Sequence, residues 1–344
     1  MPDLRANITN WRTAPHNRWA FRNVDRVVSC ATIAHDRTHV RPLPRASGKL
    51  RSILTSAPFL RYTSTDAMVV MRAGLLVGII EARGELDVAA PISRYVPEIA
   101  ESPYGIATIR DLIDMRLGVK LTGTSLAAYE EATNWVPADP GRPDPSLRAF
   151  FSGLAGIEVP QASPFSYVSA NTDLLGWVLE RATGETIAAL VSAHLWQPMG
   201  AEADAAITVD REGLARCAGG LCATVRDLAR IGQLMINGGA VGSTQVVPGP
   251  WVEDIWQNGD PQAWRTGEWG KVFAPISQNM RYRSNWYVID DHPETLFAMG
   301  IHGQNLFVDR VNQLVVAKLS HWPKPTMSLP TWLTHKAFGR LQRK

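Results

Sequence analysis

The clearest helical pattern in the chain follows a polar turn near its middle. The apolar residues of this pattern fall on one helical face and are Leu174, Leu175, Val178, Leu179 and Ala182. The preceding turn, residues 167–171, has no helical period and contains a phenol, a hydroxyl and an amide. Asn171 or Thr172 is expected to cap the helix, and Gly184 is expected to end it. The polar turn is therefore expected to be held rigidly from one side.

The same kind of pattern predicts helices elsewhere in the chain. They are expected over residues 73–84, 109–116, 187–196 and 225–236. Thr108 and Thr224 each precede an aspartate by three residues, which is typical of a capping box at a helix start. Residues 73–84 resemble the middle of a buried helix that ends at Gly84. They follow a predicted buried strand, residues 66–72, without an intervening turn.

The last third of the chain shows short apolar stretches with the spacing of hairpins. Strands are predicted over residues 286–289, 305–309 and 314–319, and they indicate an antiparallel sheet. Residues 118–164 are rich in Gly, Pro, Ala, Ser and Thr and show no clear period. We interpret them as a long excursion of the kind that often covers a binding site. Residues 1–64 are interpreted as an irregular arm that packs over the core.

The composition favours a globular protein of the reducing cytoplasm. The chain has 344 residues, of which 45% are hydrophobic and 19% are charged, and this balance is ordinary for an enzyme. Its longest apolar run, residues 73–80, is too short to cross a bilayer, and residues 1–12 lack the hydrophobic core of a signal peptide. Three cysteines, an odd number, argue against a disulfide framework. We expect a cytoplasmic location and no membrane partner.

The charge distribution and the positions of the cysteines and histidines predict neither a nucleic-acid partner nor a metal site. Residues 1–72 carry 12 Lys and Arg against 4 Asp and Glu, a surplus of 12 − 4 = +8 within a net charge of +3. The arginines are scattered among prolines and glycines without aromatic interleaving, so no nucleic acid is expected. Cys217 and Cys222 lack partner ligands, and His35 and His39 lie in a loop without a third ligand. No metal and no cofactor are predicted.

Five stretches resemble, in the same order, the 6-aminohexanoate-dimer hydrolases, which are β-lactamase-related serine hydrolases close to the class C β-lactamases. They are residues 15–21, 169–173, 207–210, 226–230 and 300–306. The resemblance implies an α/β (α+β) sandwich of the β-lactamase/transpeptidase type, with an antiparallel sheet flanked by helices and a helical lobe. Residues 65–344 are then expected to form one domain, with its sheet from 65–72 and 285–320 and its lobe over roughly 85–240.

The implied chemistry is hydrolysis of a small amide or ester through an acyl-enzyme. In this family a Tyr-x-Ser motif relays a proton, and it matches Tyr167 and Ser169. For an isolated tyrosine, a half-buried residue in front of a capped helix is the commoner explanation, and the resemblance raises the catalytic interpretation above it. Asn171, which follows the motif, is a candidate substrate contact.

A second family motif lies on a sheet strand and matches residues 298–301. The resemblance makes the backbone N–H of Ile301 an oxyanion donor, with Gly300 beside the substrate. Ala298 replaces the lysine of the β-lactamases, so an antibiotic substrate is disfavoured. His302 either contacts substrate or is satisfied within the turn of the sheet.

The family's Ser-x-x-Lys motif is missing, and we find no nucleophile. None of the seven lysines has a serine three residues before it. Relative to the family, about 30 residues would be absent at the junction of Arg72 and Ala73, roughly a strand, a loop and a helical turn. Two smaller departures are the absence of a tyrosine in residues 117–124 and Ala218 in place of an expected asparagine before Gly219.

Two hypotheses follow from this pattern. In the first, the protein is a small-substrate amidase or esterase, and this sequence is a shortened version of an otherwise active gene product. In the second, the deletion is genuine, and the chain is a non-catalytic remnant that at most binds a ligand in the old cleft. The expected partner in both is a small amide or ester, and the sequence predicts no oligomeric state.

Overall fold

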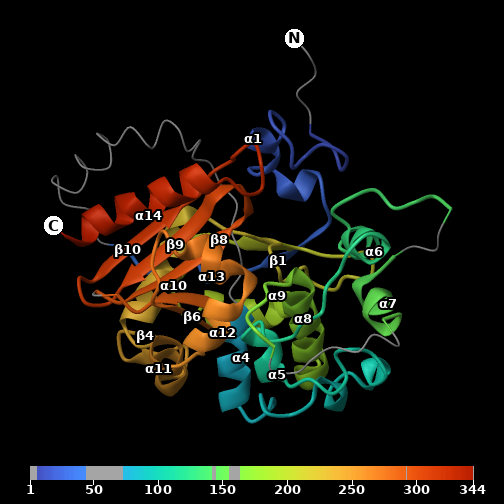
Figure 1. Ribbon diagram of the computed structural model, residues 1–344, viewed down its shortest axis with the longest axis horizontal. Helices are drawn as coiled ribbons and strands as arrows, with labels where there is room; N and C mark the ends of the chain where they lie inside the picture. The colour runs from blue at the N-terminus through green and yellow to red at the C-terminus, as the bar shows by residue number, and fades with distance from the viewer. Residues whose placement is uncertain (1–5, 44–72, 142–144, 155–162, 292, 344) are drawn as a thin grey trace.

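The fold consists of an antiparallel sheet covered by helices and a helical lobe beside it (Figure 1). The computed structural model describes residues 6–43, 73–141, 145–154, 163–291 and 293–343. This arrangement confirms the architecture that the resemblance implied. The strand predicted over residues 66–72 lies outside the described residues, as do residues 1–5 and 44–64 of the predicted arm.

The main sheet has five antiparallel strands in the order β10-β9-β8-β7-β6. Their bounds are Met280–Arg283 for β6, Trp286–Ile289 for β7, Thr295–Gly300 for β8, Gln304–Asp309 for β9 and Leu314–Lys318 for β10. The three strands predicted from the apolar pattern are therefore confirmed as β7, β9 and β10. Strands β6 and β8 complete the sheet and were absent from that pattern.

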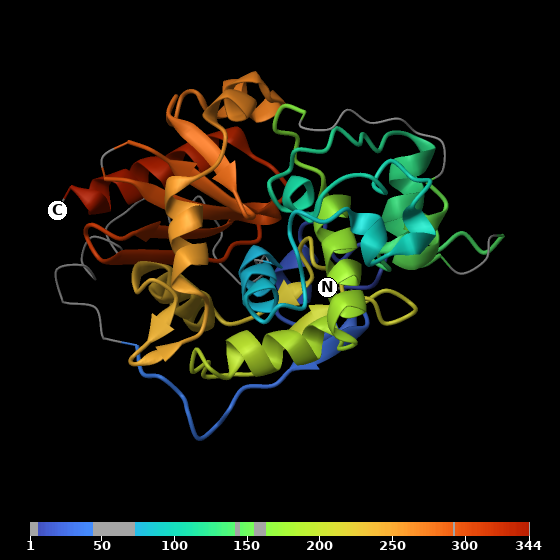
Figure 2. The same ribbon diagram turned by 90° about the horizontal axis from the view of Figure 1, so that it is seen from below.

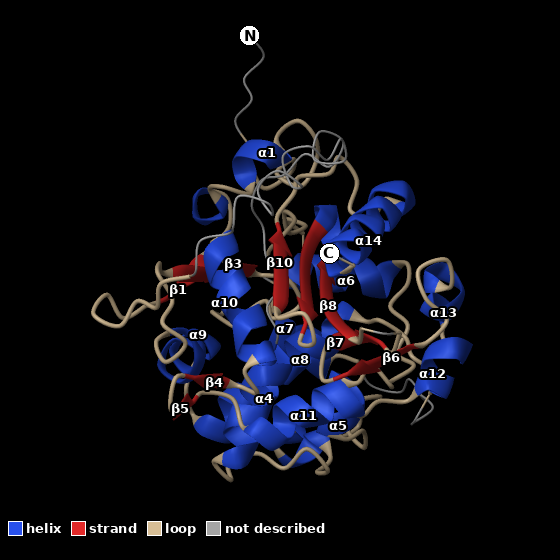
Figure 3. Cartoon of the chain, turned by 90° about the vertical axis from the view of Figure 1, so that its left-hand side faces the viewer, coloured by secondary structure: helices blue, strands red, loops and turns tan. Residues whose placement is uncertain are grey.

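The two faces of the sheet are lined by different side chains because residues alternate sides along a strand. Leu296 and Leu306 face the core that includes helix α10, Val225–Ile236. Phe297 and Phe307 face an aromatic cluster completed by helix α14, Ser328–Gln342. Figure 3 shows α10 and α14 on opposite sides of the strands. Each helix thus covers one apolar face.

The lobe and the sheet are bridged by helix α4, Ala73–Ala82, which lies between them in Figure 2. Its residues Leu75, Leu76, Val77 and Ile80 are almost completely buried. Gly84 follows in the left-handed conformation with φ of +77°, as expected for a glycine that ends a helix. The predicted buried helix ending at this glycine is confirmed.

The other helices of the lobe are mostly short. They are α5 (Ile109–Ile113), α6 (Thr124–Ala132), α7 (Leu147–Ser152), α8 (Ser169–Thr183) and α9 (Ile187–Val191). The capping box at Thr108 is confirmed, but α5 ends three residues before the predicted end because Met115 takes a positive φ of +54°. Helices α6 and α7 lie in the stretch interpreted as an irregular excursion. In α6 only Tyr129 and Ala132 are buried, which explains the weak sequence period.

The N-terminal arm contains more regular structure than predicted. It forms α1, Asn17–Ala20, and β1, Cys30–Ile33, which heads a small sheet in the order β1-β2-β3. The partners are β2, Ala205–Thr208, and β3, Leu221–Cys222. These strands have only two to four residues, so they show no period of their own. The division into an arm and one domain stays a prediction.

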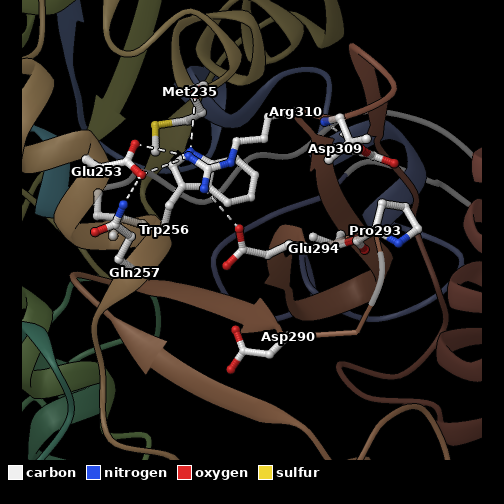
Figure 4. Close-up of polar contacts among 12 residues, drawn as sticks. Met235, Glu253, Trp256, Gln257, Asp290, Pro293, Glu294, Asp309 and Arg310 are labelled. Carbon is white, nitrogen blue, oxygen red and sulfur yellow. Dashed lines mark hydrogen bonds and ion pairs between the residues drawn. The ribbon is translucent and has the colours of Figure 1, made fainter.

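A charged cluster fastens helix α11, Gly249–Gln257, to the sheet (Figure 4). The Arg310 guanidinium carbon lies 4.5 Å from the centre of the Trp256 ring. Arg310 also donates to Glu253 at 3.0 Å and to Glu294 at 3.3 Å. Arg310 directly follows Asp309, the last residue of β9, whereas Ile301 lies three residues before Gln304, the first residue of β9. The cluster therefore supports the end of the sheet opposite Ile301.

The remaining elements connect these layers. They are the hairpin of β4 (Ala240–Val241) and β5 (Thr244–Gln245), and the helices α12 (Pro261–Thr266) and α13 (Glu268–Phe273). Both helices supply rings to the aromatic cluster under the sheet, Trp264 from α12 and Phe273 from α13. Within the described ranges, no helix has the length and apolar content needed to span a membrane.

Candidate functional site

The lobe side of the predicted site is formed by the start of helix α8. The helix begins at Ser169 with Val168 at its N-cap, so the prediction that Asn171 or Thr172 caps it is wrong. Asn171 is instead fully buried, and its Oδ1 accepts a hydrogen bond from the Tyr104 hydroxyl at 3.1 Å. This interior bond explains the difference, because it holds Asn171 inside the helix and away from any surface that a ligand could reach. The predicted end of the helix at Gly184 is confirmed by its φ of +75°.

Tyr167 lies directly before this helix and is half-buried. Its ring stacks on Trp269 with a centroid distance of 5.1 Å and an angle of 20° between the planes. Ser169, two residues later, occupies the first position of α8 and is also half-buried. The polar turn is thus fixed between an aromatic ring and a buried helix. The proton relay by Tyr167 and the place of Ser169 in the same family motif stay predictions.

A buried ion pair holds α8 against the turn that contains Ala218. Asp173 is fully buried and accepts hydrogen bonds from the Tyr129 hydroxyl at 2.6 Å and from the Ala218 N–H at 2.8 Å. Arg216 completes the group by donating to the same carboxylate. Burial lowers the pKa of Arg216, but Asp173 and Tyr129 together raise it above its ordinary value, whereas burial raises the pKa of the Asp173 carboxyl. Every polar atom of the Asp173 side chain therefore has a partner.

The sheet side of the predicted site is the turn after β8. Gly300 ends the strand, and Gly300 and Ile301 are half-buried. His302 is fully buried with a positive φ of +60°, its N–H donates to the Pro325 carbonyl at 2.8 Å, and its Nδ1 lies 2.7 Å from the Trp322 carbonyl. Burial lowers the pKa of this imidazole. The contacts of its N–H and Nδ1 fit the interpretation of His302 as a residue held within the turn, and its buried Nε2 has no hydrogen-bond partner among the described residues. Because the side chain is fully buried, a direct substrate contact does not fit.

The start of helix α4 brings no reactive side chain between these two sides. The Gly74 carbonyl accepts a hydrogen bond from the Trp251 indole at 2.9 Å. A Cβ atom at Gly74 would collide with the Ser284 carbonyl in the turn between β6 and β7. The helix contains no serine and no lysine in its whole length. The described part of α4 therefore supplies packing and neither a nucleophile nor its base.

A serine and a lysine do meet elsewhere, and the sequence reasoning missed them. Lys318 is the last residue of β10, and its Nζ donates to Ser320 Oγ and, at 3.1 Å, to the Gly303 carbonyl. The Ser-x-x-Lys motif has a spacing of three, which suits a helix. Lys318 and Ser320 are two residues apart, a spacing that places side chains on one side of a strand. Ser320 is completely buried and Lys318 is 6% exposed. No substrate reaches this pair in the folded structure, so we assign it a structural role.

One of the five resembling stretches, residues 226–230, is structural. Arg230 is almost completely buried and donates to Asp227 at 3.0 Å, to Glu202 at 3.1 Å and to the Arg41 carbonyl at 3.0 Å. Asp227 in turn accepts from the Thr224 cap. These contacts join α10 to the arm, and none of them involves Tyr167 or Ile301.

A cavity of about 330 Å³ lies at another junction of the lobe and the sheet. It is lined by Asp114, Arg116, Asp260, Trp264, Tyr282 and Arg283, among others. Its charges are paired, because Arg116 contacts Asp260 at 2.8 Å and Arg283 contacts Asp114 at 2.6 Å. Tyr167, Ser169 and Ile301 do not line it, so the cavity is separate from the predicted site. In the part of the chain that the structure describes, no group of three His, Cys, Asp or Glu residues could hold a metal ion.

Comparisons of the sequence show its relatives. The beta-lactamase family model matches residues 71–339. The 6-aminohexanoate-dimer hydrolase of Paenarthrobacter ureafaciens is 29% identical over 354 residues, covering 92% of this chain and 88% of that protein. Esterase EstB of Burkholderia gladioli is 33% identical over 127 residues, covering 35% of this chain and 32% of EstB.

Solved structures show the same fold. A Bacillus anthracis structure, named as a candidate 6-aminohexanoate-dimer hydrolase, superimposes with a TM-score of 0.83 and 21% identity, covering 99% of this chain and 97% of that chain. A class C beta lactamase from Rhodobacter sphaeroides gives a TM-score of 0.55 and 16% identity, covering 80% of this chain and 84% of that chain. The fold is therefore that of the β-lactamases and penicillin-binding proteins, and the chain belongs to the beta-lactamase family of serine hydrolases.

Proposed function

We propose that this chain binds a small amide or ester between the turn at Tyr167 and the end of β8, and that it forms no acyl-enzyme itself. The observation that carries this proposal is the sequence of α4, which brings neither a serine nor a lysine to the space between the two sides. An acyl-enzyme needs a nucleophile activated by a neighbouring base. The proposed activity is thus ligand binding by a member of a hydrolase family.

Each side of the site is proposed to contact one part of the ligand. The Ile301 N–H and the backbone of Gly300 would meet the carbonyl group, and the hydroxyls of Tyr167 and Ser169 would face its nitrogen or oxygen substituent. Asn171 and His302 would act only through packing, because both side chains are fully buried. Oriented N–H donors polarise a carbonyl even when no nucleophile attacks it.

A second candidate is that the active protein contains a segment that this sequence lacks. The alignment with the Paenarthrobacter hydrolase extends over 354 residues, more than the 344 of this chain, although it covers only 92% of the chain. The chain therefore has gaps opposite that relative, which supports a deletion. A native protein heavier than 37.8 kDa would favour this second candidate.

The experiment compares binding with turnover. A 4-nitroanilide of a short fatty acid is titrated into the purified chain by calorimetry, and release of 4-nitroaniline is followed by absorbance. We expect saturable binding without release of the chromophore. Release that one serine-to-alanine substitution abolishes would contradict the proposal. A heat signal that does not saturate as nitroanilide is added would show that the chain has no specific site for it and would contradict the proposal.

We further propose, from the sequence, a cytoplasmic location, an arm over residues 1–64 and no nucleic-acid partner. Fractionation of cells that produce the protein would test the first point. Limited proteolysis would test the second, because a separate arm is expected to be cleaved from an intact domain.

A further inference from the structure

Helix α14 carries a row of exposed side chains on the face turned away from the sheet, which we call the α14 stripe. Its members, from the first turn of the helix to its C-cap, are Leu329, Trp332, Lys336, Arg340 and Arg343. At 100° per residue these positions fall within an arc of about 80°. The buried residues of the helix lie on the opposite side and face the aromatic cluster of the sheet. Because α14 covers the face of the sheet opposite α10, the stripe points outward (Figure 3).

The part of the chain that contains the stripe has no acidic residue. Residues 311–344 contain four lysines, two arginines and no aspartate or glutamate, a surplus of 6 − 0 = +6. This surplus is denser than that of residues 1–72, where 4 acidic residues offset part of 12 basic ones. One of the six basic residues, Lys318, is buried in the sheet, and another, Lys324, is exposed in the turn before α14. Positive charge is therefore concentrated on this face of the protein.

The cations of the stripe are not neutralised by neighbouring carboxylates. In the described part of the chain, no ion pair joins Lys336, Arg340 or Arg343 to an acidic side chain. Asp309 adjoins the last turn of α14, but it is fully buried. Glu294, near the same turn, is paired with two arginines outside the helix. The stripe thus presents its positive charge to solvent.

The first half of the stripe is apolar. Leu329 is 66% exposed and Trp332 is 40% exposed. The Lys336 ammonium nitrogen lies 5.6 Å from the centre of the Trp332 ring, so the apolar and the cationic parts of the stripe adjoin. Leucine, tryptophan and basic residues on exposed faces are typical of helices that lie in the interface between water and lipid.

We propose that the α14 stripe binds the surface of a membrane that contains anionic lipids. Such a surface is complementary in charge to the stripe, and each Lys or Arg near it strengthens binding about fivefold. Leu329 and Trp332 enter the headgroup layer beside these contacts. This differs from the expectation of no membrane partner, which depended on the lack of a spanning segment and of a signal peptide. Binding at the surface requires neither of them.

Other occupants of this face match its features less well. Two copies of the stripe would repel each other, because like charges that face one another across an interface are unfavourable. A protein partner would need a groove that fits a convex helix, whereas a lipid surface adapts to one. Membrane binding by the stripe does not depend on the proposed amide or ester site.

Co-sedimentation with vesicles tests the proposal. The full chain is mixed with vesicles of phosphatidylcholine, or of phosphatidylcholine and phosphatidylglycerol in equal parts. Binding is measured at about 0.1 M and about 1 M salt, because the Debye length falls from about 10 to about 3 Å between them. We expect binding to the anionic vesicles alone and its loss at the higher salt concentration. The triple substitution Lys336→Gln, Arg340→Gln and Arg343→Gln is expected to weaken binding about a hundredfold, as three cations are lost.

A matched triple variant controls for net charge. Arg26→Gln, Arg37→Gln and Lys120→Gln remove three exposed cations of the arm and the lobe. This control is expected to change the affinity less than about threefold at the lower salt concentration, because distant charges are screened. Circular dichroism melts check that both triple variants are folded.

A fluorescence measurement tests the apolar part of the stripe. Lipids with brominated acyl chains quench a tryptophan that enters the membrane interface. Quenching is expected for the unsubstituted chain and is expected to be smaller in Trp332→Phe. Equal quenching of the two would show that Trp332 stays outside the lipid, against the proposal.

Three further outcomes would overturn the proposal. Equal binding to the neutral and the anionic vesicles would refute the role of charge. Equal losses in the two triple variants would show that net charge, and not the α14 stripe, determines binding. No binding to either vesicle would remove the membrane as the occupant. Retention on heparin, or a molecular mass that rises with concentration, would in that case identify a polyanion or a second copy instead.

Discussion

The two sides of the proposed cleft each bury a charged side chain, and they treat it differently. On the lobe side, Asp173 receives hydrogen bonds from Tyr129, Ala218 and Arg216. On the sheet side, Lys318 donates only to neutral oxygens, those of Gly303 and Ser320. Within the described part of the chain, no carboxylate pairs with Lys318. The Asp173 carboxylate is therefore compensated by the opposite charge of Arg216, whereas the Lys318 ammonium is not compensated by a carboxylate.

This difference shows how the two sides hold their site residues. The lobe side joins α8 to the Ala218 turn through a network whose partners depend on one another. On the sheet side, burial lowers the pKa of Lys318 to about 8, so this region becomes sensitive to pH. The expectation is a rigid lobe side and a sheet side whose stability depends on the protonation of one lysine.

The largest loss of stability is expected from breaking the ion pair of Asp173 with Arg216. Asp173→Ala leaves Arg216 buried without its carboxylate, and loss of one member of such a pair costs about 3–5 kcal/mol. Urea denaturation would measure the free energy of unfolding. The control Asp291→Ala, at an exposed position, is expected to change it by less than about 0.5 kcal/mol. Similar values for the two variants would contradict the role given to Asp173.

Removing the uncompensated charge is expected to stabilise the protein below pH 8. The pKa of Lys318 is about 8 in the folded chain and 10.5 as its ordinary value, so burying the cation at pH 6 costs about 3 kcal/mol. This cost disappears as the pH rises through the window from about 8 to 10.5. Lys318→Met is expected to raise the free energy of unfolding by about 1–3 kcal/mol at pH 6, since lost hydrogen bonds offset part of the gain.

The test of this prediction is the free energy of unfolding measured from pH 6 to pH 10.5. The gain in Lys318→Met should shrink steadily above pH 8. The exposed Lys324→Met provides the matched control and should show no such trend. A gain that is constant across this range would mean that packing and not charge explains it.

A smaller acid-dependent effect is expected from His335 on the far face of the sheet. Its ring lies 4.8 Å from that of Phe297 and 5.0 Å from that of Phe307, and burial lowers its pKa to about 3. Because the unfolded chain binds the proton below about pH 6.5, stability falls as the pH drops, by about 2 kcal/mol at pH 5. His335→Leu should remove this slope in a titration from pH 7 to 4.5, whereas the exposed His39→Leu should retain it.

The smallest stability change is expected for Tyr167→Phe. The substitution keeps the ring that stacks on Trp269, so the free energy of unfolding should change by less than about 1 kcal/mol. Affinity for the nitroanilide should still fall several-fold, because the substitution removes the hydroxyl that we propose to face the ligand. An unchanged affinity would remove Tyr167 from the proposed site.

Local signals predicted much of this fold. The capping box at Thr108, the N-cap at Thr224 and the helix ends at Gly84 and Gly184 depend on residues within one turn, so the sequence reveals them directly. Strands β7, β9 and β10 were found for the same reason, whereas β6 and β8 were not. The resemblance to a family then supplied the architecture that these elements build.

Contacts between distant residues could not be predicted in this way. The Asn171 side chain is held by Tyr104, 67 positions earlier, and this bond overrides its local preference for a helix cap. The pairing of β1 with β2 joins segments far apart in the chain. The contact of Lys318 with Ser320 likewise depends on the assembled sheet. The absence of a Ser-x-x-Lys motif, by contrast, can be seen in the sequence alone.

The central claim is that the fold and both sides of the cleft persist without a nucleophile. The most direct test is the intact mass of the folded chain before and after treatment with a serine-directed fluorophosphonate, followed by peptide mapping. We predict that the mass stays at 37.8 kDa with no adduct. A stoichiometric adduct on one serine, whether Ser169, Ser320 or another, would contradict the claim and identify the nucleophile.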